Sequence, residues 1–390
     1  MSSMRRRRKR RKLNLLIPVA DEALELQVED LVASLSREEK VAQLFFAAPE
    51  ALTGGGIVTA VDSALSEAYR RYPVGGFILF EANLINPEQT EKLLGGLQRC
   101  AMDRQGIPVF LGVDEEGGRV ARIAGKGGFG VDRVRSAAKL AAGGADAVSQ
   151  AAGTIGGYLA DLGFNLDFAP DADVLTDPEN RVIGDRSFGG DPETVSELAR
   201  VFAGGLRAHG IIPCYKHYPG HGGTAEDSHE GYAFSHKNLA ELRRAELVPF
   251  ADVVADGAEM IMAAHISLPE ITGSKLPASL SEQMITGILR GELGYEGVVI
   301  TDALDMGAVS DNYTPAESAV MALQAGCDML LLSGHFEEAY QAVLDAAVSC
   351  PSTYQPVPAG SIILHSAFLI LHCYRFSDDL PRPSVNFLQF

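Results

Sequence analysis

The chain has 390 residues, of which 46% are hydrophobic and 22% are charged, and its net charge at pH 7 is -18. This composition is typical of a soluble globular protein that is long enough for one large barrel or two ordinary domains. The acidic balance argues against nucleic acid as the main partner. The five cysteines are scattered and form no Cys-x-x-Cys pair, so we expect free thiols or buried small residues rather than a disulfide framework or a zinc site.

The first 20 residues differ from the rest because basic residues run without interruption from Arg5 to Lys12. The apolar stretch that follows is short and contains Asn14 and Pro18, which makes it a poor signal-peptide core. We therefore predict a disordered basic segment over residues 1–20 and a cytoplasmic protein, with export by a weak N-terminal signal as the alternative. Since no uninterrupted apolar run reaches the roughly 18 residues of a membrane-spanning helix, we expect no membrane span.

The next segment, residues 21–42, has leucines and valines at helical spacing, and Ser36 and Glu39 have the spacing of a capping box. Short apolar runs that favour strands then recur eight times, at Leu44–Ala47, Gly76–Phe80, Val109–Val113, Phe164–Phe168, Ile211–Tyr215, Met260–Ala264, Val298–Thr301 and Met329–Leu332. Segments with helical periodicity separate most of these runs, at Pro87–Met102, Ala137–Leu162, Pro192–His209, Leu239–Asp256, Ser281–Leu293 and Pro315–Ala325.

Alternating strands and helices predict parallel strands with right-handed crossovers. Eight such units in about 300 residues favour an α/β fold of the (β/α)8 TIM-barrel type over a doubly wound sheet. No Gly-x-Gly-x-x-Gly follows the first strand, so a dinucleotide site is not indicated. We predict a single catalytic barrel domain over residues 21–345. The tail, residues 346–390, departs from the pattern, and we assign it no role.

Polar residues follow most of the predicted strands. They are Asp114 and Glu116, then Asp167, Asp171 and Asp173, then Lys216 and His217, then His265, and finally Thr301 and Asp302. In a parallel barrel all of these positions face one mouth, where active sites lie.

Two aspartates, Asp302 and Asp227, stand out as candidates for a part in catalysis. Asp302 ends an apolar strand, where a carboxylate is costly unless it has a partner or a role. Asp227 precedes His229 by two residues on a glycine-rich loop, and an aspartate at this spacing can orient an imidazole and raise its pKa. A fixed carboxylate nucleophile and an acid/base are the minimum for double displacement at an acetal carbon.

Less specific interpretations of the same residues remain open. Asp302 alone is also compatible with a helix cap or an ion pair. The three histidines at 217, 221 and 229 with Asp227 match no standard set of metal ligands, so we expect no metal. The cationic residues Arg122, Arg186 and Lys216, together with His217, have the character of groups that hold a carbohydrate.

Six motifs together resemble family 3 glycoside hydrolases, over about residues 25–345. They are Gly112–Val120, Asn165–Pro170, Val182–Phe188, Lys216–Gly222, Asp227–His229 and Thr301–Leu304. The glycine-rich loop with Asp-Ser-His marks the β-N-acetylglucosaminidase (NagZ-like) branch, since β-glucosidases of the family usually carry their acid/base on a second domain. Tyr218 stands where Phe is more usual, and the tail after about residue 350 does not resemble the closing helix of these enzymes.

The resemblance implies a role for each matching position. It makes Asp302 the nucleophile and His229 the acid/base, with Asp227 as its dyad partner. It also makes Asp114, Arg122, Arg186, Lys216 and His217 substrate-binding residues. The implied activity is a retaining exo-β-N-acetylglucosaminidase, without a cofactor, that removes non-reducing N-acetylglucosamine from fragments of peptidoglycan.

The alternatives are an N-acetylglucosamine phosphorylase, a β-glucosidase of the same family and an inactive sugar-binding protein. The small carbohydrate is the expected partner in each case. The sequence does not indicate an oligomeric state.

Overall fold

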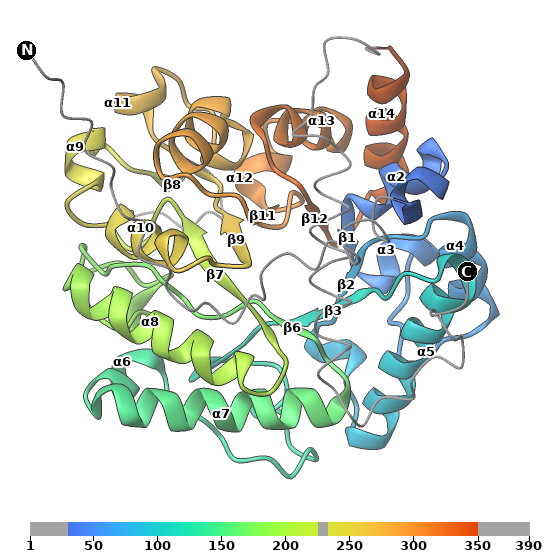
Figure 1. Ribbon diagram of the computed structural model, residues 1–390, viewed down its shortest axis with the longest axis horizontal. Coiled ribbons are helices and arrows are strands. Elements are labelled where there is room, and N and C mark those ends of the chain that lie inside the picture. The colour runs from blue at the N-terminus through green and yellow to red at the C-terminus, as the bar shows by residue number, and fades with distance from the viewer. Residues whose placement is uncertain (1–29, 225–232, 350–390) are drawn as a thin grey trace, which may run out of the picture.

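Eight parallel strands form the centre of the protein, and helices surround them in the computed structural model, which describes residues 30–224 and 233–349 (Figure 1). The central strands are β1 (Phe45–Ala47), β2 (Gly76–Ile78), β3 (Phe110–Val113), β6 (Leu166–Asp167), β7 (Ile212–Tyr218), β9 (Met260–Ala263), β11 (Val298–Thr301) and β12 (Leu330–Leu332). Each lies on one of the eight predicted runs. The observed strands differ from the predicted runs only at their ends. The largest difference is at the end of β7, which continues through Lys216 and His217.

The eight strands form a closed barrel. Their order is β11-β9-β7-β6-β3-β2-β1-β12, and every pairing between neighbours is parallel. The two ends of this order meet, since Ile300 and Met329 form a parallel bridge and the Thr301 N–H donates to the Met329 carbonyl at 3.0 Å. The predicted (β/α)8 fold is therefore confirmed.

Helices cover the outside of the barrel. They are α2 (Arg37–Gln43), α3 (Pro49–Thr53), α4 (Ser63–Arg71), α5 (Pro87–Gln105), α6 (Ala137–Ala141), α7 (Gly144–Leu162), α8 (Pro192–Arg207), α9 (Leu239–Leu242), α10 (Leu247–Ala255), α11 (Pro269–Thr272), the π-helix η4 (Gln283–Glu292), α12 (Gly307–Ser310), α13 (Pro315–Ala325) and α14 (Phe336–Ser349). Short 3₁₀ turns lie at Glu81–Asn83, Gly184–Arg186 and Ala278–Leu280. Small additional strands are β4 (Glu115–Gly117), β5 (Val120–Ala121), β8 (Ala233–Phe234) and β10 (Ile266–Ser267).

The start of several helices follows directly from the local sequence. Ser36 caps α2 with the predicted capping box, in which its hydroxyl accepts from the Glu39 N–H and its own N–H donates to the Glu39 carboxylate. Proline at the first helical position follows a capping side chain in α5, α8 and α13.

Two predicted long helices are interrupted in the structure. The segment predicted as helical from residue 137 to 162 is broken between α6 and α7, where Gly144 adopts a left-handed φ of 77° that a helix interior does not allow. The segment predicted from residue 239 to 256 is likewise divided into α9 and α10. Apolar spacing alone does not show such breaks, because the apolar positions continue on both sides of them.

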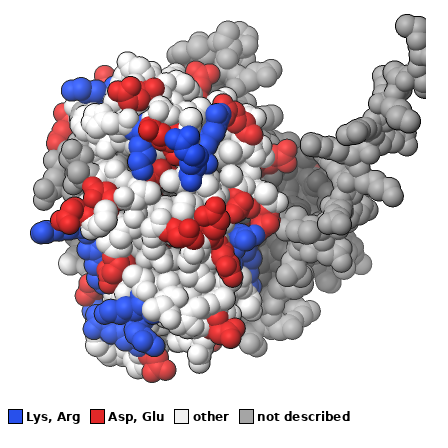
Figure 2. Space-filling model, turned by 90° about the vertical axis from the view of Figure 1, so that its left-hand side faces the viewer, with Lys and Arg blue, Asp and Glu red and all other residues white. Residues whose placement is uncertain are grey.

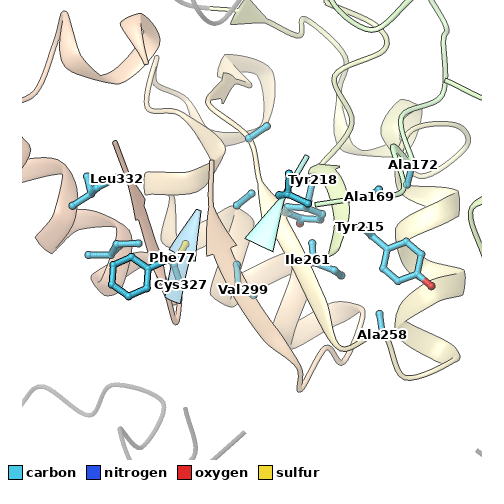
Figure 3. Packing of buried hydrophobic residues seen from close by; sticks show 14 of the residues in the cluster. Phe77, Ala169, Ala172, Tyr215, Tyr218, Ala258, Ile261, Val299, Cys327 and Leu332 are labelled. Atoms are coloured by element: carbon cyan, nitrogen blue, oxygen red, sulfur yellow. The ribbon is translucent and has the colours of Figure 1, made fainter. Parts of the chain in front are cut away.

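The barrel interior is filled by its own cluster of side chains, separate from the layer between strands and helices. Phe46 of β1 lies in this interior, and its ring occupies the space that two glycines leave open. A Cβ atom on Gly76 would lie 2.2 Å from the Phe46 ring, and one on Gly112 would lie 2.9 Å from it. Figure 3 shows part of the outer layer, where Tyr215, Ile261 and Val299 come from the neighbouring strands β7, β9 and β11.

The surface carries both signs of charge. On the face that includes the left-hand side of Figure 1, Lys and Arg are interspersed with Asp and Glu (Figure 2). None of the helices within the described ranges is long and apolar enough to cross a membrane. Of the five cysteines, Cys100, Cys214 and Cys327 lie in the described part of the chain and are free thiols, as predicted.

Candidate active site

The carboxyl ends of the central strands bring the predicted polar side chains to one end of the barrel. Asp114 follows β3, and Asp171 and Asp173 follow β6. Lys216 and His217 lie within the last part of β7, and Asp302 directly follows β11. Because all eight strands are parallel, these positions share the mouth at which barrel enzymes bind their ligands.

Lys216 is the central cation of this mouth. Its Nζ atom lies 2.7 Å from a carboxylate oxygen of Asp114 and 2.7 Å from one of Glu116. The Lys216 side chain is 3% exposed, so its charge depends on these two partners rather than on water. Burial alone would lower the pKa of Lys216, but Asp114 and Glu116 raise it above its usual value, so the ammonium stays charged.

Arg186 provides a second cation against the same glutamate. Its Nε and Nη2 atoms donate to the two oxygens of Glu116 at 2.8 and 2.7 Å, which is a bidentate pair. Burial alone would raise the pKa of Glu116, but Arg186 and Lys216 outweigh it and hold this pKa far below its usual value. Glu116 is therefore ionised and fixes both cations in place.

The tautomer of His217 follows from its two neighbours. Its Nε2 atom lies 3.2 Å from Arg186 Nη2, and its Nδ1 atom lies 2.7 Å from Asp173 Oδ2. An arginine can only donate, so Nε2 accepts and the ring proton is on Nδ1, which donates to Asp173. Burial, assisted by Arg186, lowers the pKa of His217 to about 4, so the ring is neutral near pH 7.

The group formed by Asp171, Asp173 and His217 has the geometry of a small metal site, since one ligand atom of each lies within 4.8 Å of the others. Burial and the adjacent Asp173 raise the pKa of Asp171 well above its usual value, which disfavours a second negative charge beside Asp173. His217 Nδ1 is occupied by Asp173, and Arg186 lies 3.6 Å from Asp171. These contacts favour a hydrogen-bonded network around Arg186 over a cation site.

Asp302 is held at the mouth by its own backbone. Its N–H donates to the Ala263 carbonyl at 2.9 Å, and its Oδ1 atom accepts from the Ala303 N–H at 2.8 Å. Burial alone would raise the pKa of Asp302, but His265, His217, the Ala303 N–H and Lys216 outweigh it and lower the pKa below its usual value. The carboxylate is therefore ionised at neutral pH, which is the state that a nucleophile requires.

The predicted site residues differ in how the structure places them. Asp114, Arg186, Lys216 and His217 are joined through Glu116 into one network, and Asp302 lies close enough for Lys216 and His217 to influence its charge. Arg122 follows the β4–β5 hairpin, and its Nε atom is buried without a hydrogen-bond partner in the described part of the chain. The predicted dyad, Asp227 and His229, lies outside the described residues.

Two residues of the network were not predicted as functional. Glu116 binds both cations, and Asp173 binds the His217 ring and also accepts from the backbone N–H groups of His217 and His221. Their positions after β3 and β6 were visible in the sequence. No local pattern indicates which cation each carboxylate binds, because the partners are far apart along the chain.

Comparison with known proteins supports the resemblance to family 3 glycoside hydrolases. The model of the family described as "Glycosyl hydrolase family 3 N terminal domain" matches residues 36–358. A Beta-hexosaminidase A from Pseudoalteromonas piscicida is 37% identical over 288 residues, which are 70% of this chain and 48% of that protein. A Beta-hexosaminidase from Chromobacterium violaceum is 37% identical over 295 residues, which are 73% of this chain and 80% of that protein.

A solved structure has the same architecture. A glycoside hydrolase family 3 β-N-acetylglucosaminidase from Paenibacillus sp. str. FPU-7 superposes with a TM-score of 0.78 at 36% identity, covering 88% of this chain and 62% of that one. The chain thus spans about half of the P. piscicida protein and less than two thirds of the Paenibacillus chain. These matches and the barrel with its ionised strand-end carboxylates lead to one conclusion: the chain belongs to glycosyl hydrolase family 3 and contains its N-terminal barrel domain.

Proposed function

We propose that the protein is a retaining exo-β-N-acetylglucosaminidase that removes a non-reducing N-acetylglucosamine, with fragments of peptidoglycan as its substrates. The observation that carries this proposal is Asp302, a half-buried carboxylate whose pKa is lowered at the barrel mouth beside a network of sugar-binding character. The relatives named β-hexosaminidase and β-N-acetylglucosaminidase support the choice of sugar.

In the proposed reaction, an oxygen of Asp302 attacks the anomeric carbon while the bond to the leaving group breaks. His229, oriented by Asp227, gives its proton to the departing oxygen. Water then attacks the covalent intermediate, His229 takes a proton from that water, and Asp302 is released. Two inversions at one carbon retain the anomeric configuration.

The network around Glu116 has a separate part in this proposal. Asp114, Lys216 and Arg186 offer charged acceptors and donors to sugar hydroxyls, and neutral His217 lies between Arg186 and Asp173. Because Glu116 fixes both cations before any substrate arrives, little rearrangement is needed on binding. Arg122, whose buried Nε atom lacks a partner in the described ranges, is a further donor for the substrate.

The direct test is release of 4-nitrophenol from its β-N-acetylglucosaminide and its β-glucoside, with and without phosphate. We expect hydrolysis of the N-acetylated substrate alone, and a loss of at least about 10³-fold in kcat for Asp302→Asn. Asp311→Asn, an exposed aspartate nearby in sequence, is the matched control and should retain full activity. Dependence on phosphate would assign a phosphorylase, preference for the glucoside a β-glucosidase, and sugar binding without turnover a binding protein.

Three further measurements address the mechanism and the substrate. Proton NMR during hydrolysis should show the β-anomer of N-acetylglucosamine first, and early α-anomer would contradict retention. His229→Ala should lose less activity on substrates with activated leaving groups than on unactivated ones, since the former need little protonation. Release of N-acetylglucosamine from purified muropeptides, compared with chito-oligosaccharides, tests the proposed source of the substrate.

A further inference from the structure

A histidine outside the sugar-binding network forms a hydrogen bond with the turn that carries Asp302. His265 follows β9 and is fully buried. Its Nε2 atom lies 2.9 Å from the carbonyl oxygen of Ala303, and its Nδ1 atom lies 2.7 Å from the hydroxyl oxygen of Ser279. Ser279 is also buried, and its N–H donates to the Ala264 carbonyl at 3.1 Å, so it is fixed relative to β9.

The hydrogen-bond partners define the tautomer of this ring. A carbonyl oxygen can only accept, so His265 Nε2 carries a proton and donates it to Ala303. Burial lowers the pKa of His265 in spite of the opposing charge of Asp302, so the ring is neutral and has one proton only. The bare Nδ1 atom therefore accepts from the Ser279 hydroxyl, and the two bonds point in one direction from Ser279 to Ala303.

The hydrogen bond from His265 is one of several that hold the backbone of the turn after Asp302 in place. The peptide between Ala303 and Leu304 is held on both sides, because its carbonyl accepts from His265 and its N–H donates to the Leu331 carbonyl at 3.0 Å. The preceding peptide donates from Ala303 to Asp302 Oδ1 at 2.8 Å. The backbone that orients the Asp302 carboxylate is thus fixed between the ends of β9 and β12.

We propose that His265, held as its Nε2–H tautomer by Ser279, is a positioning residue that fixes the Asp302 carboxylate for attack on the sugar. This inference rests on the proposed function, in which Asp302 is the nucleophile. His265 would act through the backbone and would not touch the substrate. A displacement of about 1 Å at a reacting atom can cost about 10²-fold in rate, so loss of this one bond should be measurable.

The experiment compares variants that remove or keep the donor. His265→Leu keeps an apolar side chain but lacks the N–H, whereas His265→Gln offers an amide N–H in its place. Pre-steady-state release of 4-nitrophenol gives the rate of formation of the glycosyl-enzyme, and calorimetry gives the Kd for N-acetylglucosamine. Thermal melting identifies variants that fail to fold. His209→Leu, at an exposed position after α8, is the control and should leave both quantities unchanged.

We expect His265→Leu to slow formation of the glycosyl-enzyme about 10²-fold while the Kd changes less than about three-fold. His265→Gln should recover at least about ten-fold of that loss, and Ser279→Ala should cost about ten-fold or less, as expected for an ordinary hydrogen bond. Equal losses in the Leu and Gln variants, or a Kd that weakens in step with the rate, would overturn the proposal and assign His265 to packing alone.

Failure of the proposed function gives a different result. If the folded wild-type protein forms no glycosyl-enzyme, the reaction assigned to Asp302 is wrong, and its positioning by His265 falls with it. The arrangement of the ring is tested independently of activity by ¹⁵N NMR. A neutral ring protonated at Nε2 is expected, and a proton at Nδ1 alone would overturn the proposed direction of the two hydrogen bonds.

Discussion

Lys216 and Asp114 are 102 residues apart in the sequence, and the Nζ atom of the lysine lies 2.7 Å from a carboxylate oxygen of the aspartate. Strand β6 separates β7, which contains Lys216, from β3, which Asp114 directly follows. The pair therefore forms only when the barrel is assembled. The substrate-binding groups of the protein and its fold thus depend on each other.

Replacing Lys216 with methionine should lower stability as well as sugar binding. The change leaves the buried Glu116 with one cation instead of two and leaves Asp114 without its partner. Breaking a buried ion pair in this way costs about 3–5 kcal/mol of the free energy of unfolding. Urea unfolding measures the loss, with Lys92→Met as control, because the pair of Lys92 with Glu88 is exposed and its removal should change the free energy of unfolding far less. Similar losses in both variants would contradict the buried role of Lys216.

Replacing Arg186 with lysine should weaken substrate binding although the charge is kept. An ammonium cannot form the two parallel bonds to Glu116 and also donate to His217. We expect kcat/KM for the N-acetylglucosaminide to fall about 10- to 100-fold, which corresponds to one or two charge-assisted hydrogen bonds. Arg200→Lys, in the half-exposed pair with Asp256 on the outside of the barrel, should change kcat/KM less than about two-fold. A comparable loss there would attribute the effect to arginine in general rather than to this site.

His217 should make stability depend on pH on the acid side. Its pKa of about 4 in the folded protein is below the value of about 6.5 for an unfolded chain. The unfolded chain therefore binds a proton at this ring more readily than the folded protein does. The contribution of His217 to the free energy of unfolding is full above about pH 6.5 and is lost as the pH falls toward 4, at up to about 1.4 kcal/mol per pH unit. The free energy of unfolding of His217→Gln, measured from pH 7 to pH 4, should fall less steeply than that of the wild type. Parallel curves would show that His217 titrates normally.

The barrel interior should reject one methyl group at Gly76. A Cβ atom there would lie 2.2 Å from the Phe46 ring, which is itself enclosed by the interior cluster. We expect Gly76→Ala to destabilise the protein by about 1–3 kcal/mol or more through overpacking. Gly204→Ala is the matched control, because Gly204 is exposed on α8 and has free space around it. That substitution should stabilise the helix by up to about 1 kcal/mol, and a loss of stability there would contradict the packing argument.

The fold was predictable because the spacing of apolar residues along the chain reflects which positions are buried. All eight strands lie where short apolar runs predicted them, and the polar residues that follow those runs lie at the barrel mouth. The extension of β7 through Lys216 and His217 was not predictable from polarity. Within a strand these two residues are buried, and what makes their burial possible is the set of carboxylates supplied by other strands.

The pairing of charges in the site is the part that the sequence did not indicate. The prediction named Arg186 and Lys216 as sugar-binding groups, whereas the structure also joins each of them to Glu116. Such a contact depends on how far each loop projects over the barrel mouth, and no local pattern encodes this distance. The role of His265 was hidden for the same reason, since its partner Ala303 lies 38 residues away on another strand end.

The location of Lys216 and His217 within β7 has a practical consequence for redesign. Both residues contribute backbone to the barrel wall and side chains to its mouth, so mutagenesis at these positions would select for folding before it selected for a new sugar preference. Libraries directed at altered specificity have more freedom in the connections beyond the strand ends. There, replacements at positions outside the Glu116 network and the hydrogen bonds of the Asp302 turn leave intact the scaffold that presents the reacting groups.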